Sequence, residues 1–108
     1  MAACKFCFPL EDLIVKEHRH FIIALDENPP SGGVGYVLMA KRHVPSIEKL
    51  SPEEEKEYYS ALSELYGYLR ERFPKRKGMT ILTEEGHGIF IEKETGHLRT
   101  HFWVWTEE

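Results

Sequence analysis

The chain has 108 residues, of which 42% are hydrophobic and 30% charged, and its formal net charge is −4. This length suits a single domain, residues 1–108, and the composition excludes extensive disorder. The negative charge argues against binding to nucleic acid, and no apolar run approaches the ~20 residues of a membrane span. The amino-terminal residues contain no apolar signal core, so we expect a cytoplasmic protein.

Extended structure is predicted for the first part of the chain. Residues 13–25 are expected to be extended with a break near Lys16, and the apolar run 21–25 is typical of a buried strand. Dense turn chemistry over 26–33 separates this run from a second strand over 35–41. That strand leads into the segment Arg42-His43-Val44-Pro45.

A long helix follows. Ser51 is a suitable N-cap, with Pro52 in the first helical position and Glu54 placed to complete a capping box. Apolar residues then recur at helical spacing and form one stripe, made of Tyr58, Leu62, Leu65, Tyr66 and Leu69. The sequence Phe73-Pro74 predicts the end of the helix.

Three strands are expected after the helix. Two of them, over 79–83 and 88–92, flank a turn at 84–87, and the third begins near His97. The order of strands around one helix predicts an α+β domain with a mostly antiparallel sheet.

The closing strand carries an unusual row of side chains. In His97-Leu98-Arg99-Thr100-His101-Phe102-Trp103, alternate residues face the same side of a strand. Two histidines and an arginine therefore share one face, which Trp103 continues. Cationic groups need partners when buried, so this row predicts a site for an anion or a metal.

A pair of cysteines, Cys4 and Cys7, has the C-x-x-C spacing of metal-binding or redox-active thiols. Zinc prefers four ligands, so two more must come from elsewhere, and His43 and His97 are the best candidates. Two reduced thiols without a metal are the alternative. A redox site is less favoured, because no helix begins after Cys7 to lower a thiol pKa.

The order of these motifs resembles the histidine-triad (HIT) superfamily of nucleotide-binding hydrolases and transferases. The resemblance covers nearly the whole chain. It rests on the cysteine pair, the turn Asp26-Glu27-Asn28-Pro29, the segment Lys41-Arg42-His43-Val44-Pro45-Ser46, the helix start Leu50-Ser51-Pro52-Glu53-Glu54 and the closing run from His97 to Trp103.

The resemblance implies a five-stranded, mostly antiparallel sheet with one long helix and a shorter helical segment, commonly assembled as a homodimer. It implies a zinc ion held by Cys4, Cys7, His43 and His97. The implied ligand is a nucleotide or another phosphorylated small molecule. Asp26 would hold the ribose, with Asn28 and Trp103 as further binding residues.

Arg99 is the departure that matters. In active HIT proteins the middle histidine of the triad attacks phosphorus, and a permanently protonated guanidinium cannot do so. Arg99 would instead bind phosphate, and His101 would be the remaining nucleophile or general acid. The turn residues Glu84 and Glu85 also depart from the family pattern and would repel a polyphosphate.

A second alignment, shifted by two residues, remains open. It places His101 in the nucleophile position and Arg99 in the position of a zinc ligand, which is chemically poor. We favour the alignment with His97 first, because it keeps all four ligands.

Two functions follow. One is a HIT-like zinc protein that binds a phosphorylated small molecule, with weak hydrolase or transferase activity. The other is a catalytically inactive, zinc-stabilised nucleotide-binding or regulatory protein. A small zinc module that meets nucleic acid or a protein is least favoured, because the chain is acidic.

Overall fold

The computed structural model describes residues 9, 11–27, 29, 33–86 and 96–106. In chain order they form the 3-10 helix η1 (Glu11–Leu13), the strands β1 (Ile14–Glu17), β2 (Phe21–Leu25) and β3 (Gly33–Ala40), the 3-10 helix η2 (Ile47–Lys49), the helix α1 (Pro52–Arg72), and the strands β4 (Gly78–Glu84) and β5 (Arg99–Trp105). The predicted α+β class with one long helix is confirmed.

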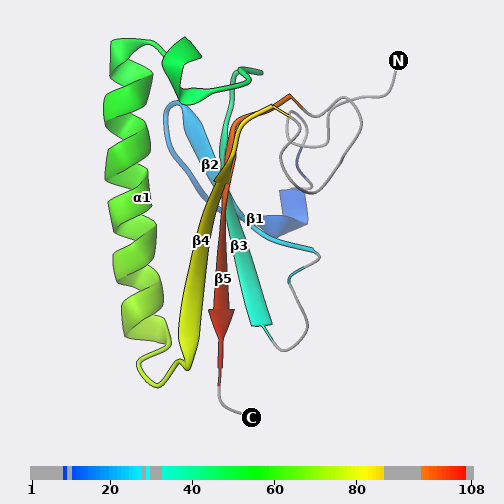
Figure 1. Cartoon of the computed structure of the whole chain (residues 1–108), viewed down its shortest axis with the longest axis vertical. Coiled ribbons are helices and arrows are strands. Elements are labelled where there is room, and N and C mark those ends of the chain that lie inside the picture. Colours follow the sequence, from blue (N-terminus) through cyan, green and yellow to red (C-terminus); the bar gives the residue numbers. More distant parts are fainter. Residues whose placement is uncertain (1–8, 10, 28, 30–32, 87–95, 107–108) are drawn as a thin grey trace.

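The five strands form one antiparallel sheet in the order β1-β2-β3-β5-β4 (Figure 1). The last strand, β5, lies between β3 and β4, so that Met39 is opposite Arg99 and Gly33 is opposite Trp105. Because β5 has a neighbour on each side, its backbone pairs with both β3 and β4 in the interior of the sheet.

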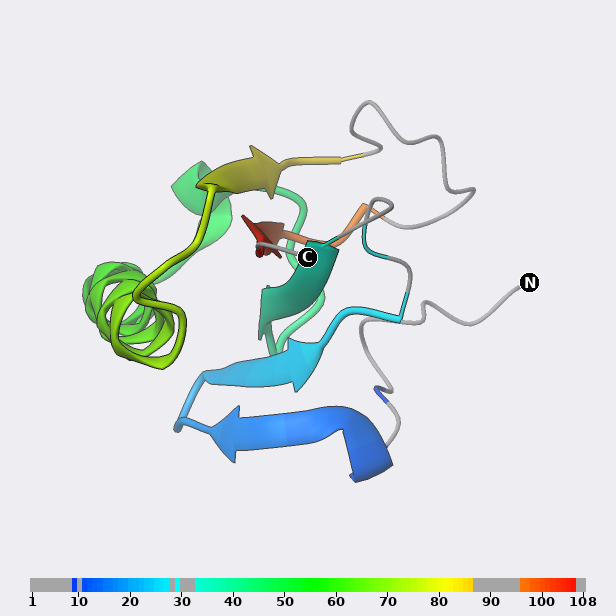
Figure 2. The same cartoon turned by 90° about the horizontal axis from the view of Figure 1, so that it is seen from below.

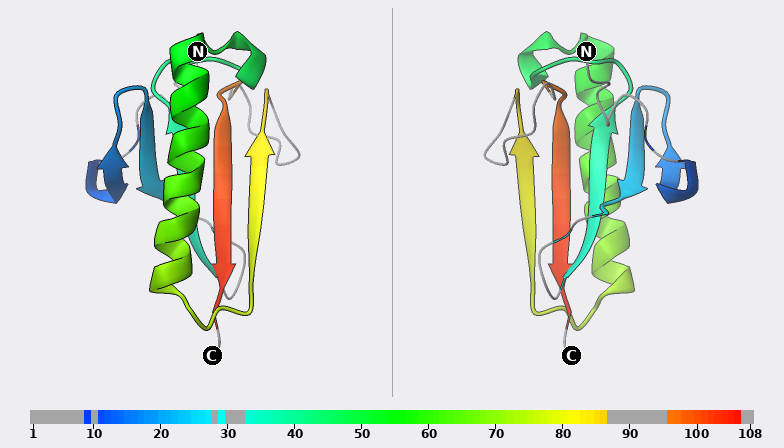
Figure 3. Two further views of the ribbon diagram at one scale, coloured as in Figure 1. Left: turned by 90° about the vertical axis from the view of Figure 1, so that its left-hand side faces the viewer. Right: turned by 90° about the vertical axis from the view of Figure 1, so that its right-hand side faces the viewer.

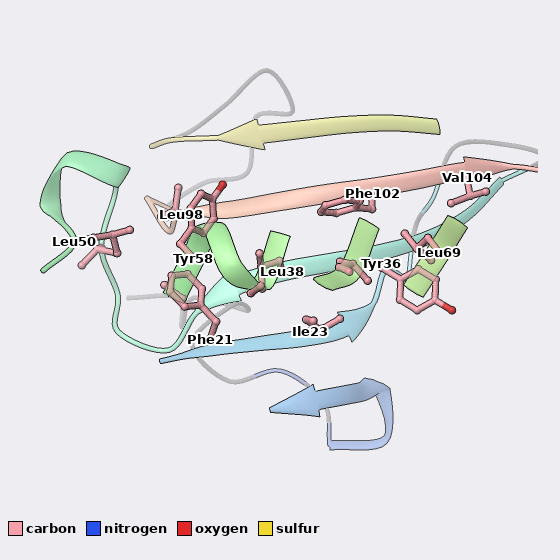
Figure 4. Packing of buried hydrophobic residues seen from close by; sticks show 14 residues of the cluster. Phe21, Ile23, Tyr36, Leu38, Leu50, Tyr58, Leu69, Leu98, Phe102 and Val104 are labelled. Carbon is pink, nitrogen blue, oxygen red and sulfur yellow. The ribbon is translucent and has the colours of Figure 1, made fainter. Parts of the chain in front are cut away.

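The helix α1 covers one face of this sheet (Figures 2 and 3). Buried apolar side chains fill the layer between them, and the larger ones are Phe21, Ile23, Tyr36, Leu38, Tyr58, Leu65, Leu69, Leu98, Phe102 and Val104 (Figure 4). Since neighbouring strand residues face opposite sides, the other face of the sheet receives a different set, including a small cluster of Ala24, Val37 and Met39.

The predicted strands correspond closely to the observed ones, with two differences. The extended segment 13–25 is divided into β1 and β2 by a tight turn, in which the His18 backbone N–H donates to the Phe21 carbonyl over 2.7 Å. The strand predicted over 88–92 lies outside the described residues. In the part of the chain that is described, no helix is long and apolar enough to cross a membrane.

The start of α1 confirms the predicted capping box. The Glu54 backbone N–H donates to the Ser51 hydroxyl over 3.1 Å, and the Ser51 backbone N–H donates to the Glu54 carboxylate over 2.8 Å. Arg42 also donates to this carboxylate, from Nη2 over 2.7 Å and from Nε over 3.1 Å. The helix start is thereby tied to the segment that precedes His43.

These contacts predict a specific loss of stability in acid. The Arg42 hydrogen bonds lower the pKa of the Glu54 carboxyl from 4.5 to about 2, although its burial acts in the opposite direction. A pKa that is lower in the folded state stabilises the protein above pH 4.5, and this contribution disappears as the pH falls toward 2. Glu54→Gln should therefore cost about 2 kcal/mol at pH 7 and much less at pH 3.

Urea unfolding of both proteins at pH 7 and pH 3 measures this difference. Glu55→Gln is the matched control, because Glu55 is exposed in the same helical turn. If Glu54→Gln and wild type lose equal stability between the two pH values, the Arg42–Glu54 contact does not lower the carboxyl pKa.

Candidate functional site

The closing strand alternates between the two faces of the sheet as predicted. Leu98, Phe102 and Val104 belong to the core beneath α1. Thr100 points the same way, because its hydroxyl lies 2.5 Å from the Tyr58 hydroxyl of the helix. The row formed by His97, Arg99, His101 and Trp103 therefore lies on the face of the sheet away from α1. In the right-hand view of Figure 3 this face is toward the viewer, and the helix lies behind the sheet.

Backbone pairing beyond the strand ends brings His43 and His97 together. The Leu98 backbone N–H donates to the Val44 carbonyl over 2.7 Å, and the Ala40 N–H donates to the Leu98 carbonyl over 3.4 Å. The segment after β3 and the segment before β5 are thus held side by side. The two imidazole rings meet edge to face, with their centroids 5.0 Å apart.

His97 is completely buried, and its Nε2 lies 2.6 Å from the Ala40 carbonyl oxygen. A carbonyl can only accept, so Nε2 carries the proton and the lone pair of the neutral ring is on Nδ1. This Nδ1 lies 3.2 Å from Nδ1 of His43. Burial lowers the pKa of His97, as do the charges of His43 and Arg99, while the Ala40 carbonyl acts the other way. A lowered pKa favours the neutral ring, which is the form that a metal ligand requires.

The two Nδ1 atoms are within hydrogen-bonding distance, and the same separation would allow both to bind one zinc ion. Two nitrogens bound to one zinc at about 2.0–2.1 Å are about 3.3 Å apart, close to the 3.2 Å observed between the two Nδ1 atoms. The Ala40 carbonyl is the kind of outer partner that orients a ligating histidine. Cys4 and Cys7 lie outside the described residues, and within the described ones no three His, Cys, Asp or Glu side chains gather as a metal site.

Arg99 is buried completely and held by groups of the protein itself. Its Nη2 donates to Oε1 of Glu84 over 3.1 Å, and its Nη1 donates to the carbonyls of Gly86 and His97, each over 2.9 Å. Glu84 is 4% exposed and directly opposite Arg99 in the β4–β5 pairing. The anion beside this guanidinium is thus an internal carboxylate.

His101 lies between two carboxylates. Its Nδ1 is 3.1 Å from Oδ2 of Asp26, and its Nε2 is 3.3 Å from Oε1 of Glu84. The ring also stacks on Trp103, with centroids 5.2 Å apart and an interplanar angle of 30°. Both ring nitrogens are thus close to a carboxylate oxygen, and these contacts together with the stacking fix the orientation of the ring.

Asp26 follows β2 and connects this part of the chain to β5 by side-chain contacts with His101 and Trp103. The Nε1–H of Trp103 donates to Oδ2 of Asp26 over 2.9 Å, and the Asp26 backbone N–H donates to the Gly35 carbonyl over 2.9 Å. A Cβ atom on Gly35 would lie 2.8 Å from Cβ of Asp26 and 3.1 Å from Cδ1 of Trp103. Glycine is required here so that Asp26 and Trp103 can approach.

Two contiguous groups of predicted site residues are therefore present. His43 and His97 form one pair. In the other group Arg99 and His101 share Glu84, while His101 and Trp103 share Asp26. Asn28 lies outside the described residues.

Glu84 is the functional residue that the sequence pattern missed. The pattern places it in a turn, whereas it is the last residue of β4 and the partner of both Arg99 and His101. Its negative charge could have identified it as a candidate partner of Arg99, since a buried arginine needs an anion. Its position opposite Arg99 depends on the pairing of β4 with β5, which the local sequence does not specify.

No protein-family model and no curated protein matches the chain. Solved structures do. A HIT family protein from Bacillus subtilis superimposes with a TM-score of 0.75 at 20% identity, over 99% of this chain and 76% of that one. A histidine triad nucleotide-binding protein from Candida albicans gives a TM-score of 0.72 at 16% identity, over 98% and 77%.

A histidine triad protein from Clostridium difficile gives a TM-score of 0.67 at 18% identity, over 100% of this chain and 96% of that one. At identities of 16–20% these likenesses show a shared fold alone. The chain has the fold of HIT family proteins.

Proposed function

We propose that the protein is a HIT-like, zinc-containing nucleotide-binding protein that does not carry out covalent nucleotidyl transfer. One observation carries this proposal: the middle position of the triad-like motif is Arg99, which is buried and bound to Glu84. Covalent transfer needs a nucleophile with a lone pair at the reacting phosphorus. Neither the charge of Arg99 nor its internal contacts meet that need.

His101 is a poor substitute for the missing nucleophile. Both of its nitrogens face carboxylates, at 3.1 Å and 3.3 Å, so an attack from either nitrogen would first break one of these contacts. This geometry favours the inactive binding protein over the weak hydrolase or transferase, which remains the competing function.

Ligand binding is proposed at Asp26, His101 and Trp103, and Asn28 is proposed as a further binding residue. A carboxylate that accepts hydroxyl hydrogens is a sound sugar ligand, and Asp26 lies at the end of β2, next to the aromatic surface of Trp103. A nucleotide is proposed as the ligand because one protein of similar fold is a histidine triad nucleotide-binding protein.

The proposed zinc ion would be held by Cys4, Cys7, His43 and His97. The neutral, oriented ring of His97 and its spacing from His43 support this ligand set, which belongs to the alignment with His97 first. When bound, such a zinc ion supplies structural stabilisation by joining the amino-terminal residues to the sheet. In the shifted alignment Arg99 would be the ligand, and its buried contact with Glu84 argues against that role.

A homodimer is also proposed. The strand β4 is last in the sheet order, and its Ile81 side chain is 46% exposed. Tyr59 and Tyr66, which share one face of α1, are exposed as well. Exposed apolar side chains on an edge strand and its neighbouring helix are suited to contact with a second copy.

Binding without turnover tests the proposed function. We expect calorimetry to detect binding of AMP, and incubation with adenosine phosphoramidate, a dinucleoside polyphosphate or a nucleoside-diphosphate sugar to release no product. Asp26→Asn should weaken AMP binding by about tenfold. Glu27→Gln is the matched control, because this neighbouring carboxylate is exposed, and it should leave the affinity unchanged. Turnover that His101→Ala abolishes would instead establish the competing catalytic function.

A further inference from the structure

The Glu84 carboxylate lies between two nitrogen-bearing side chains of the closing strand. Its Oε1 atom is 3.1 Å from Nη2 of Arg99 and 3.3 Å from Nε2 of His101. Glu84 is 4% exposed, so it has little access to water. A guanidinium and an imidazole nitrogen that converge on one shielded oxygen form the kind of contact that a protein offers to a bound phosphate.

Among the described residues, the Arg99 guanidinium is already paired with the Glu84 carboxylate, and the Asp26 carboxylate lies on the other side of His101. A phosphate dianion at this point would approach the buried Glu84 carboxylate at short range. Like charges placed next to each other at low exposure repel strongly.

We propose that Glu84 determines the ligand specificity of this site by acting as an internal anion in the place of a ligand phosphate. The protein then recognises the nucleoside part of its ligand, through the Asp26 end of the network, and gains little affinity from the phosphate. This inference rests on the proposed nucleotide-binding function. It makes Glu84 a specificity-determining residue and Arg99 its structural partner.

The test compares adenosine, AMP and inorganic phosphate as probes of wild type and Glu84→Gln. The substitution keeps the size of the side chain and removes its charge. Wild type should bind adenosine and AMP with similar affinity. Glu84→Gln should bind AMP at least about tenfold more tightly than wild type does, with the adenosine affinity unchanged. Glu85→Gln, which removes an exposed carboxylate at the next position, should behave like wild type.

Inorganic phosphate separates this inference from the proposed function. Phosphate should raise the thermal midpoint of Glu84→Gln more than it raises that of wild type or Glu85→Gln, relative to chloride at the same ionic strength. If no nucleoside or nucleotide binds, the proposed function fails, and this phosphate response still decides the role of Glu84. An AMP affinity or a phosphate response of Glu84→Gln equal to that of wild type would overturn the inference.

The removal of Glu84 leaves a buried guanidinium without its carboxylate, so Glu84→Gln can be unfolded in plain buffer. Far-UV circular dichroism then becomes the readout. Phosphate should restore the folded signal by supplying an anion beside Arg99, whereas chloride should not. Two results together would count against the inference. The first is that phosphate fails to refold the variant, and the second is that wild type binds AMP far more tightly than adenosine.

Discussion

Arg99→Met should lower the free energy of unfolding by about 3–5 kcal/mol. The substitution leaves the Glu84 carboxylate buried without its guanidinium, and the carbonyls of Gly86 and His97 lose a common donor. Methionine nearly fills the space, so most of the loss comes from the uncompensated charge. Urea unfolding at pH 7, followed by circular dichroism, measures it.

Two further variants show whether the loss comes from the buried pair. Arg70→Met removes an exposed arginine from α1 and should change stability by less than about 0.5 kcal/mol. The double variant Arg99→Met/Glu84→Met removes both charges and should recover most of the stability that Arg99→Met loses. A single variant as stable as wild type would show that the Arg99–Glu84 contact is not a buried ion pair in solution.

Removal of zinc should produce the second large effect. Elemental analysis should find about one zinc ion per chain, and both Cys4→Ser and His97→Ala should abolish it. Removing zinc from wild type with a chelator should lower the free energy of unfolding by about 3 kcal/mol. The reference is the same protein with free zinc at about one hundred times its Kd. For a domain of this size that loss lowers the thermal midpoint by about 10–20 °C.

His18→Ala is the matched control for the metal. His18 lies 3.4 Å from Glu64 of α1, in the turn between β1 and β2, so its removal should leave the zinc content unchanged. Zinc retained by Cys4→Ser would refute the proposed ligand set. Zinc retained by His97→Ala but lost from Arg99→Met would instead favour the shifted alignment.

The helix and most of the strands were predictable because their signals are local. The capping box of Ser51 and Glu54 defines where α1 begins within a few residues of sequence. The alternation of β5 depends only on the geometry of one strand. A break was predicted near Lys16, and the chain reverses shortly after it, at 18–20. That this break is a reversal follows only from the antiparallel pairing of β1 with β2, which the local sequence does not specify.

The candidate site divides in the same way. His43 and His97 were expected to lie together as the two further ligands of a zinc ion, and the family resemblance implied the same pair. No periodicity in the chain connects these two positions. The partner of Arg99 could not be anticipated, because Glu84 becomes its neighbour only through the register of β4 against β5.

By itself, the sequence determined which residues are chemically able to act here: an imidazole pair, a thiol pair, and an arginine in place of a nucleophilic histidine. Only the tertiary structure decided what that arginine does. Strand pairing places Glu84 against it, and a cation buried in a sheet must have its anion nearby. Asp26 and His101 meet across 75 residues of chain for the same reason, since contacts between distant segments are specified by the packing of the whole domain.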